Sequence, residues 1–206
     1  MSQLVIEPVS ETAERFPNRK RWTRDDCAFL ERVGLLPERY ELIDGEIVSK
    51  MGQNRPHAIT VTLLIKWLVA LFGGDFVQCQ LPIEVESADR QTYQPEPDAA
   101  VLVQPVTAYV SAAPGPDDLR LLVEVSDSTL RGDLQTKAAL YARAGVPEYW
   151  VLDVISRQLF VHRIPRGGAY AHIERYGEEE SVATEAAPGS VVRIADLLPP
   201  VAEAGR

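Results

Sequence analysis

The chain has 206 residues and a formal net charge of −9; 46% of its residues are hydrophobic and 25% are charged. This length accommodates one buried core and is short for two, so we expect a single domain over residues 1–206. The composition excludes a wholly disordered chain, and the acidic charge argues against binding nucleic acid through a broad basic surface. The charge does not exclude a nuclease whose carboxylates are covered by divalent cations.

In chain order, the pattern predicts a helix that begins at residue 23, a hairpin of strands 40–43 and 46–49, a helix over 58–72, strands at 76–85, 99–103 and 119–125, a helix over 133–144, and strands at 149–152 and 158–163. Thr23 opens a capping-box pattern, and Asp44-Gly45 is the strongest short-range signal for a hairpin. The helix over 58–72 is apolar nearly all round, so we expect it to be buried on more than one side.

Helices that alternate with strands predict an α/β fold, with a central mixed β-sheet flanked by helices. The core is expected over residues 23–177. An N-terminal extension precedes it, and a C-terminal tail follows with one edge strand near Val191.

No segment has the pattern of a signal peptide or of a membrane-spanning helix. The first residues lack a basic segment followed by an apolar one, and the apolar stretch at 58–72 is interrupted by Lys66 and falls short of the ~20 residues that a membrane span needs. The two cysteines, Cys27 and Cys79, have no metal-ligand spacing and are expected to be reduced core residues. These observations predict a cytoplasmic protein that does not bind membranes.

Two carboxylates interrupt otherwise hydrophobic strands. Asp98 begins the apolar run at 99–103, and Glu124 stands within Leu-Leu-Val-Glu-Val. Burying a carboxylate among apolar side chains costs several kcal/mol unless something compensates its charge, and a divalent cation held by carboxylate oxygens does so. Two other interpretations stay open: Glu124 could face solvent on a one-sided strand, and Asp98 could accept backbone hydrogen bonds.

Several segments resemble a known family. From Tyr40 to about Pro165 the chain resembles a large family of restriction-endonuclease-like proteins, abundant in cyanobacteria and long known as a domain of unknown function. The segments that carry the resemblance are Tyr40-Glu-Leu-Ile-Asp-Gly-Glu, Pro97-Asp98, Val123-Glu-Val-Ser, and Asp133-x-x-x-Lys137 continuing into Tyr141-Ala-Arg-Ala-Gly-Val-Pro-Glu-Tyr-Trp-Val-Leu-Asp153. The last of these is long and specific.

The resemblance implies a restriction-endonuclease-like fold and a site of the PD-(D/E)XK type. Asp98 matches the first acid and Glu124 the second, and together they are expected to hold Mg²⁺ (or Mn²⁺). The implied activity is metal-dependent endonuclease hydrolysis of phosphodiester bonds, probed most naturally on DNA, because divalent ions between carboxylates activate water and neutralise charge on phosphorus.

The lysine of the motif is displaced in this chain. The pattern places a lysine two residues after the second acid, where this chain has Ser126. We predict that Lys137 supplies the charge from the following helix, with its ammonium within one water molecule of the Asp98 and Glu124 carboxylates. The alternative is that Lys137 only pairs with Asp133, four residues earlier on the same helix.

Four further residues are possible additional site residues. Glu41 lies in a hairpin strand at a position that the family's pattern marks, although it could equally face solvent. His57 directly precedes the apolar helix, where it could donate to a phosphate or have no chemical role. Gln80 and Glu84 share one face of the strand before Asp98 and could point toward the site.

Two other functional classes were considered. The first is a catalytically silent module on the same fold that binds nucleic acid or protein, for which retention of both acids and a lysine is unexpected. The second is a hydrolase that uses Ser126 or Ser128 with His57 or His162, but no Gly-x-Ser-x-Gly elbow surrounds either serine. His162 and His172 are both expected at the surface.

The expected partners are nucleic acid, most simply DNA, and a second copy of the chain. A two-fold homodimer is the simplest way to cut both strands of a duplex. The strand pair that contains Trp150 and Phe160 is a candidate surface for it. Any sequence selectivity is expected to come from the loops at 50–56 and 112–118.

Overall fold

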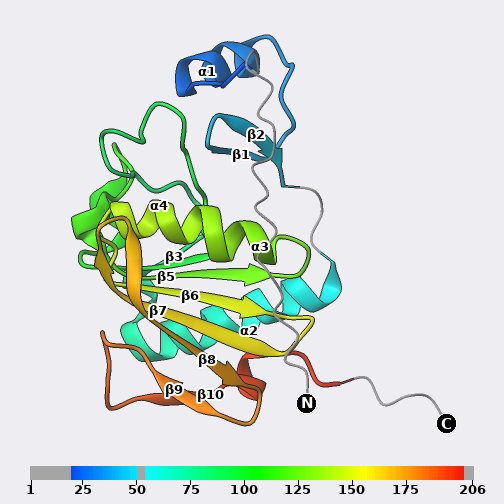
Figure 1. Ribbon diagram of the computed structural model, residues 1–206, viewed down its shortest axis with the longest axis vertical. Coiled ribbons are helices and arrows are strands. Elements are labelled where there is room, and N and C mark those ends of the chain that lie inside the picture. The colour runs from blue at the N-terminus through cyan, green and yellow to red at the C-terminus, as the bar shows by residue number, and fades with distance from the viewer. Residues whose placement is uncertain (1–19, 51–53, 202–206) are drawn as a thin grey trace, which may run out of the picture.

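The computed structural model describes residues 20–50 and 54–201, and its centre is a six-stranded sheet (Figure 1). The strands, in their order across the sheet, are β3 (Val77–Cys79), β4 (Ala99–Leu102), β5 (Leu119–Ser126), β6 (Glu148–Asp153), β7 (Gln158–Arg166) and β8 (Ala169–Gly177). β5 and β6 are parallel, and the other neighbouring pairs are antiparallel. The sheet is therefore mixed, which confirms the predicted α/β class.

Helices cover both faces of this sheet. The helical segments are α1 (Arg24–Arg32), α2 (Arg55–Phe72), α3 (Leu130–Gly132), the π-helix η4 (Asp133–Lys137), α4 (Ala138–Arg143), and four short 3₁₀ helices, η1 (Gly74–Phe76), η2 (Val106–Tyr109), η3 (Pro116–Asp118) and η5 (Ile194–Leu197). α3, η4 and α4 follow one another directly and form the crossover between the parallel strands β5 and β6. α2 packs on the opposite face.

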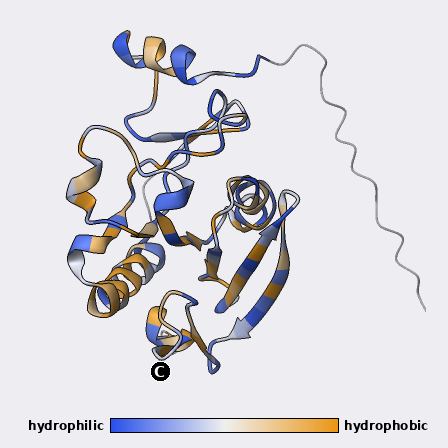
Figure 2. Cartoon of the chain, turned by 90° about the vertical axis from the view of Figure 1, so that its left-hand side faces the viewer, coloured by the Kyte–Doolittle hydropathy of each residue, from blue (hydrophilic) through white to orange (hydrophobic). Residues whose placement is uncertain are grey.

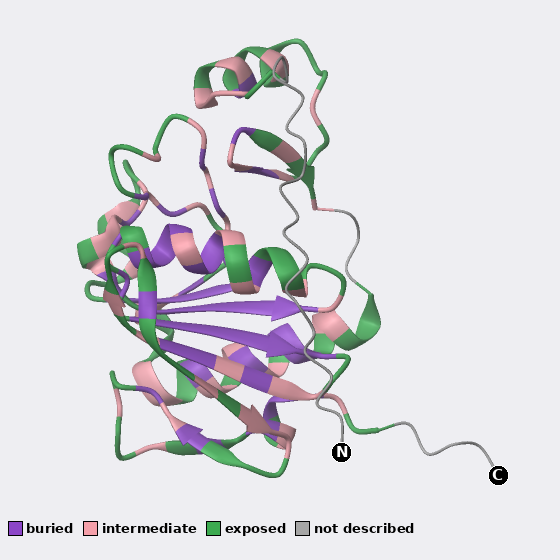
Figure 3. Cartoon of the chain, in the orientation of Figure 1, coloured by how far each residue is buried: buried purple, intermediate pink, exposed green. Residues whose placement is uncertain are grey.

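The two faces of the sheet are hydrophobic in alternation along β5. Leu121 and Val123 join the core that contains α2, whereas Leu122 joins the core that contains α4. Side chains two residues apart share a face of a strand, so Glu124 lies with Leu122 beneath the crossover. β5 and β6 are buried almost along their whole length (Figure 3). The crossover covers one face of β5 and α2 packs on the other, and only 4% of Glu124 is exposed, which excludes its solvent-facing interpretation.

Two smaller antiparallel pairs flank the main sheet. The hairpin of β1 (Tyr40–Ile43) and β2 (Glu46–Ser49) lies beyond the crossover, near α1 (Figure 1). As predicted, it turns at Asp44 and Gly45, both of which have positive φ angles. The predicted strand near Val191 also exists, as β10 (Val191–Arg193). It pairs with β9 (Ser181–Ala183) rather than with the edge of the main sheet, which corrects that expectation.

The N-terminal end of α1 agrees with the sequence, and that of α2 does not. Thr23 caps α1 through a reciprocal capping box with Asp26. α2 begins at Arg55, three residues earlier than expected, because Asn54 caps it and Pro56 is favourable in a first turn.

α2 is not buried all round: Leu64 and Leu68 are fully buried against the sheet, while Ile59 and Val69 are exposed. By length and composition alone α2 could cross a membrane, a test that the core helix of a soluble protein also passes.

The edge of the sheet differs from the predicted strand at 76–85. β3 ends at Cys79, where the next residue, Gln80, has a φ angle of 50°. Cys79 is exposed rather than in the core, whereas Cys27 is buried; both are free thiols. The outer strand β8, which was not predicted, has a largely exposed face. Some strands in Figure 2 carry alternating hydrophobic and hydrophilic bands, as expected for strands that, unlike β5 and β6, have one side toward water.

His162 was expected at the surface, and this is wrong: only 2% of it is exposed. Its ring lies 5.4 Å from that of Tyr149 and 5.6 Å from that of Tyr170, and its buried Nδ1 has no hydrogen-bond partner. Burial lowers the pKa of His162, against a smaller opposing effect of the Tyr149 backbone. His172 is exposed, as expected.

We expect His162 to make the fold less stable at mildly acidic pH. Above the unfolded-state pKa of about 6.5 both states hold a neutral imidazole. Below it the unfolded chain gains a proton that the folded chain resists, so stability falls as the pH decreases. Melting temperatures between pH 7.5 and 5 should therefore fall further for the natural chain than for His162→Phe, whose ring suits the aromatic cluster. Equal falls would show that His162 does not contribute.

Candidate active site

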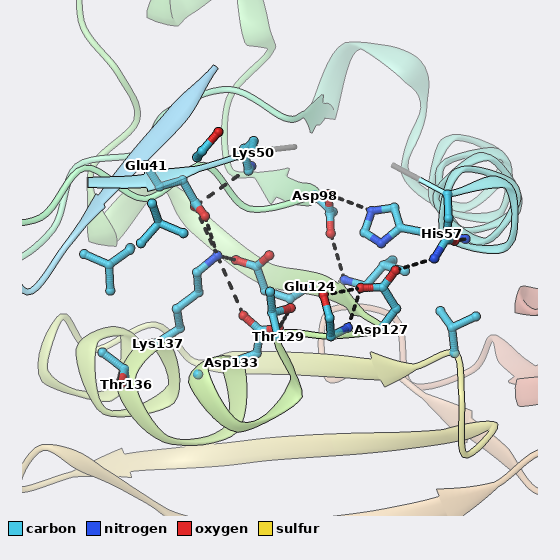
Figure 4. Close-up of a pocket in the computed structure, with 18 of the residues that line it drawn as sticks. Glu41, Lys50, His57, Asp98, Glu124, Asp127, Thr129, Asp133, Thr136 and Lys137 are labelled. Carbon is cyan, nitrogen blue, oxygen red and sulfur yellow. Dashed lines mark hydrogen bonds and ion pairs between the residues drawn. The ribbon is translucent and has the colours of Figure 1, made fainter. Parts of the chain in front are cut away.

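One large cavity, of about 1020 Å³, lies where several elements converge. Its walls come from the hairpin, the first turn of α2, the end of β5, the crossover, and the turn after β6, where Val154 and Ile155 line it. Figure 4 shows that side chains from these elements point toward one another within it. The cavity brings together most of the residues that the sequence singled out.

Asp98 and Glu124 meet because of the strand register. Ala99 of β4 pairs with Val123 of β5 in an antiparallel ladder. Asp98 directly precedes Ala99 and Glu124 directly follows Val123, so the two acids lie across from each other one step beyond the paired residues. Both side chains are buried. The two acids of the motif are thus cross-strand neighbours at the end of the ladder.

Lys137 lies between carboxylates from two other elements. Its Nζ donates to Glu124 Oε1 at 2.9 Å and to both carboxylate oxygens of Glu41 at 3.0 Å, and it stands 3.8 Å from Asp133 Oδ1. The Tyr141 hydroxyl also donates to Glu124 Oε1, at 3.1 Å. The helix pairing with Asp133 is therefore real, but it is one part of a buried network that includes the second acid.

The π-helix aims Lys137 into this network. In an α-helix, residues 133 and 137 would be one regular turn apart, whereas the wider π turn changes the direction of the side chains that follow it. Asp133 is fixed separately, since its Oδ2 accepts hydrogen bonds from the hydroxyls of Ser126 and Thr129. Ser126, the position where the motif has its lysine, is thus in contact with the same cluster.

The predicted geometry of Lys137 is met directly at Glu124. Within the described residues Lys137 makes no direct contact with Asp98, which has partners of its own. Val125 N–H donates to Asp98 Oδ2 at 2.9 Å, and Gln80 Nε2 donates to Oδ1 at 3.0 Å. His57 Nε2, which is buried and has no hydrogen-bond partner, lies 3.7 Å from the same Oδ1.

The electrostatics of the three charged groups differ. Burial raises the pKa of Glu124; Lys137 opposes this, and the nearby carboxylates add to it. Burial lowers the pKa of Lys137, but Glu124, Glu41 and Asp133 outweigh this effect and hold it above its usual value, so Lys137 stays charged. Burial raises the pKa of Asp98, yet His57, Gln80 and the Val125 amide together hold it below its usual value.

Of the four additional candidates, three reach the site and one does not. Glu41, His57 and Gln80 contact the network or Asp98 as described above. Glu84 points elsewhere, with ion pairs to Arg24 at 2.8 Å and to Arg90 at 3.1 Å. The expectation that Glu84 faces the site with Gln80 is therefore wrong, because the strand that would have aligned them ends at Cys79.

Sequence reasoning missed other polar residues of the site. Arg39, Lys50, Asp127 and Thr129 line the cavity, and Tyr141 is fully buried and contacts Glu124. Tyr141 belongs to the motif that begins with Asp133, so the motif could have suggested it. Lys50 donates to the Glu96 carbonyl at 2.6 Å, and Asp127 accepts from Asn54 at 2.7 Å. Residues 51–53 of the predicted selectivity loop lie outside the described residues.

The donor set suits a hard divalent cation held by two acids. In the described ranges, no three His, Cys, Asp or Glu side chains are grouped so that they could hold a metal ion. Mg²⁺, however, usually keeps several waters and takes one or two carboxylates. Both hydrogen bonds that Glu124 accepts end on Oε1. Of the two Glu124 carboxylate oxygens, Oε2 is therefore the one left without a donor among the described residues.

The mixed sheet thus brings Asp98 and Glu124 to the same end of neighbouring strands, with Lys137 beside Glu124. The chain belongs to the Uma2 family, described as "Putative restriction endonuclease", whose pattern matches residues 31–195. Among solved structures, the chain is similar to a "putative nuclease belonging to DUF820" from Anabaena variabilis. The two share 15% identity with a TM-score of 0.60, over 82% of this chain and 96% of that one, which supports the fold. The comparison with curated proteins finds no match.

Proposed function

We propose that this protein is a metal-dependent endonuclease that hydrolyses phosphodiester bonds in DNA. The observation that carries the proposal is the buried lysine, Lys137, held against Glu124 where Asp98 stands opposite that same acid. Several carboxylates surround one buried ammonium in this arrangement. Neither a surface ion pair nor a purely hydrophobic core would require such a cluster of charges. Membership of the family supports the same reaction class.

Each residue of the site has a distinct proposed role. Asp98 and Glu124 would hold Mg²⁺ or Mn²⁺, which supplies charge neutralisation and a more acidic bound water. Lys137 places a permanent positive charge next to Glu124, where it would help to neutralise the charge of the attacked phosphate without occupying a coordination position. Glu41 fixes the ammonium from the hairpin side, and Tyr141 fixes the Glu124 carboxylate from the helix side. Such fixed dipoles and charges need little reorganisation during reaction.

The homodimer remains a prediction, and the structure limits which residues could form its interface. We propose a homodimer for cutting both strands of a duplex. Trp150 cannot be part of its surface, because it is fully buried and stacks on Trp67 of α2 with ring centroids 5.7 Å apart. Monomeric mass in light scattering at tens of micromolar would count against the dimer. The cytoplasmic location likewise stays a prediction.

Three changes test the proposal: addition of a divalent metal, its removal by a chelator, and substitution of Asp98. Purified protein should nick or linearise plasmid DNA with Mg²⁺ or Mn²⁺, and EDTA should abolish this cleavage. The Asp98→Asn variant should cleave at least about a hundredfold more slowly. Saturating metal should raise the melting temperature of the natural chain by about 5 °C, since a ligand of the native state stabilises it. Asp117→Asn, an exposed acid outside the cavity, is the matched control and should behave like the natural chain.

A silent module on the same fold predicts different results. Cleavage that is equal in Asp98→Asn and in the natural chain would point to a contaminant or to another site. A natural chain that neither cleaves nor gains stability from either metal would favour the binding module.

A further inference from the structure

Two cations stand together at the open end of the hairpin. Arg39 directly precedes β1 and Lys50 directly follows β2, and the Lys50 N–H donates to the Arg39 carbonyl at 3.0 Å. Tyr40 pairs with Ser49 in the ladder, so Arg39 and Lys50 form the next cross-strand pair. Opposed residues project from the same face. Both side chains line the cavity.

These cations are less engaged than Lys137. The Arg39 side chain is 46% exposed; it donates to Gln80 Oε1 at 3.4 Å, and its nearest carboxylate, Glu96, is 4.0 Å away. A guanidinium has five N–H donors, so most of them lack a partner within the described residues. Lys50 uses one donor on the Glu96 carbonyl and lies 3.7 Å from the Glu96 carboxylate and 3.9 Å from that of Glu41. Both cations can therefore accept another anion.

The acidic lining of the cavity means that an anionic substrate needs positive charge at the rim. The acids that line it are Glu41, Asp98, Glu124, Asp127 and Asp133. Lys137 is already enclosed by three of them, and the chain carries a net charge of −9. A polyanion approaching this interior is repelled unless positive charge meets it at the rim. The hairpin end is where the cavity offers that charge.

Gln80 links the hairpin end to the acids. Its amide oxygen accepts from Arg39, while its amide nitrogen donates to Asp98 at 3.0 Å. The guanidinium is thus one side chain away from Asp98. Gln80 adopts a φ of 50°, a left-handed conformation that costs a residue with a side chain about 1 kcal/mol or more. The strained backbone directs the amide into the gap between Arg39 and Asp98.

We infer that Arg39 and Lys50 form a subsite for a phosphate of the nucleic-acid strand, next to the phosphate that is cleaved. The planar guanidinium matches two phosphate oxygens, and the ammonium adds a point charge from the neighbouring strand. The inference rests on the proposed function, because it names how that site holds its substrate. It predicts that the hairpin end contributes to binding more than to chemistry.

The test compares Arg39→Gln and Lys50→Gln with Arg175→Gln, a change of equal charge at an exposed position in β8. Binding of a fluorescein-labelled oligonucleotide, single-stranded and duplex, is measured by anisotropy in EDTA at several salt concentrations. Arg39→Gln and Lys50→Gln should each weaken binding about tenfold at low salt. Each should also reduce the slope of log Kd against log salt by about 0.7–0.9. Arg175→Gln should change neither, and Arg39→Lys should recover part of the loss.

Steady-state cleavage with Mg²⁺ gives the second measurement. The loss of kcat/KM in Arg39→Gln should be carried by a higher KM, as expected for contacts present in both the bound and the transition state. If Arg39→Gln and Lys50→Gln bind as Arg175→Gln does, the subsite is wrong even if cleavage is seen. If the chain does not cleave but binding still depends on both cations, the proposed function fails while the phosphate subsite stands.

Discussion

Replacing Lys137 by Met should lower the rate of DNA cleavage by about a hundredfold to a thousandfold, the range found when one preorganised charge is removed from a reacting centre. The side chain keeps its length and loses only the ammonium that contacts Glu124 and Glu41. Mg²⁺ should still raise the melting temperature, because the acids remain. Single-turnover cleavage and thermal shifts measure the two effects separately. A variant that cleaves at the natural rate would show that Lys137 only pairs with its neighbours.

Folding must be controlled, because Lys137 compensates buried acids. Removing one partner of a buried ion pair destabilises a protein by about 3–5 kcal/mol. The double variant Lys137→Met/Glu41→Gln restores the charge balance and should regain stability without regaining activity. Adding Ser126→Lys to Lys137→Met places an ammonium at the position the motif normally uses, where the Ser126 hydroxyl now contacts Asp133. Part of the activity should return in that variant.

The sequence singled out the two acids and the lysine that the structure brings to one cavity, but it did not predict their contacts. Asp98 and Glu124 stood out as charges within hydrophobic strands, and the long segment that starts at Asp133 indicated the family. That the two acids oppose one another depends on the register of β4 and β5, which alternation along single strands does not determine. The π turn before Lys137 was likewise not predictable, since helix periodicity does not distinguish it from an α-helix.

The incorrect predictions share one physical cause, which is long-range context. A pattern of alternating residues extended the strand beyond Cys79, but the left-handed Gln80 ends it and turns Glu84 toward Arg24. His162 alternates with apolar residues and was therefore assigned to the surface, yet Tyr149 and Tyr170 cover it. Which face of a strand receives a cover is decided by elements distant in the sequence.

Glu148 is a second buried acid in the long family motif, and it was not recognised from the sequence. It starts β6, is fully buried, and accepts hydrogen bonds from the Trp150 indole at 2.9 Å, from Arg163 at 2.6 and 2.9 Å, from the Thr184 hydroxyl, and from the Glu185 N–H at 2.8 Å. The signal for it was the one used at Glu124, a carboxylate within an apolar strand. Here the charge is compensated by a set of hydrogen-bond donors that includes the Arg163 guanidinium.

Glu148→Ala should therefore lower the free energy of unfolding by about 3–5 kcal/mol, because it removes the buried carboxylate that pairs with Arg163 and leaves several buried donors without a partner. For a chain of this size the melting temperature should fall by about 10 °C. Glu174→Ala is the matched control. It removes another carboxylate near Arg163, which lies at 3.5 Å and is 41% exposed, and should cost at most about 1 kcal/mol. Urea denaturation measures both changes in the free energy of unfolding, and the m-value should be the same in all three proteins. Equal losses in the two variants would mean that the donors around Glu148 find water or other partners once the acid is gone. Burial of this hydrogen-bond network would then add nothing to the stability of β6.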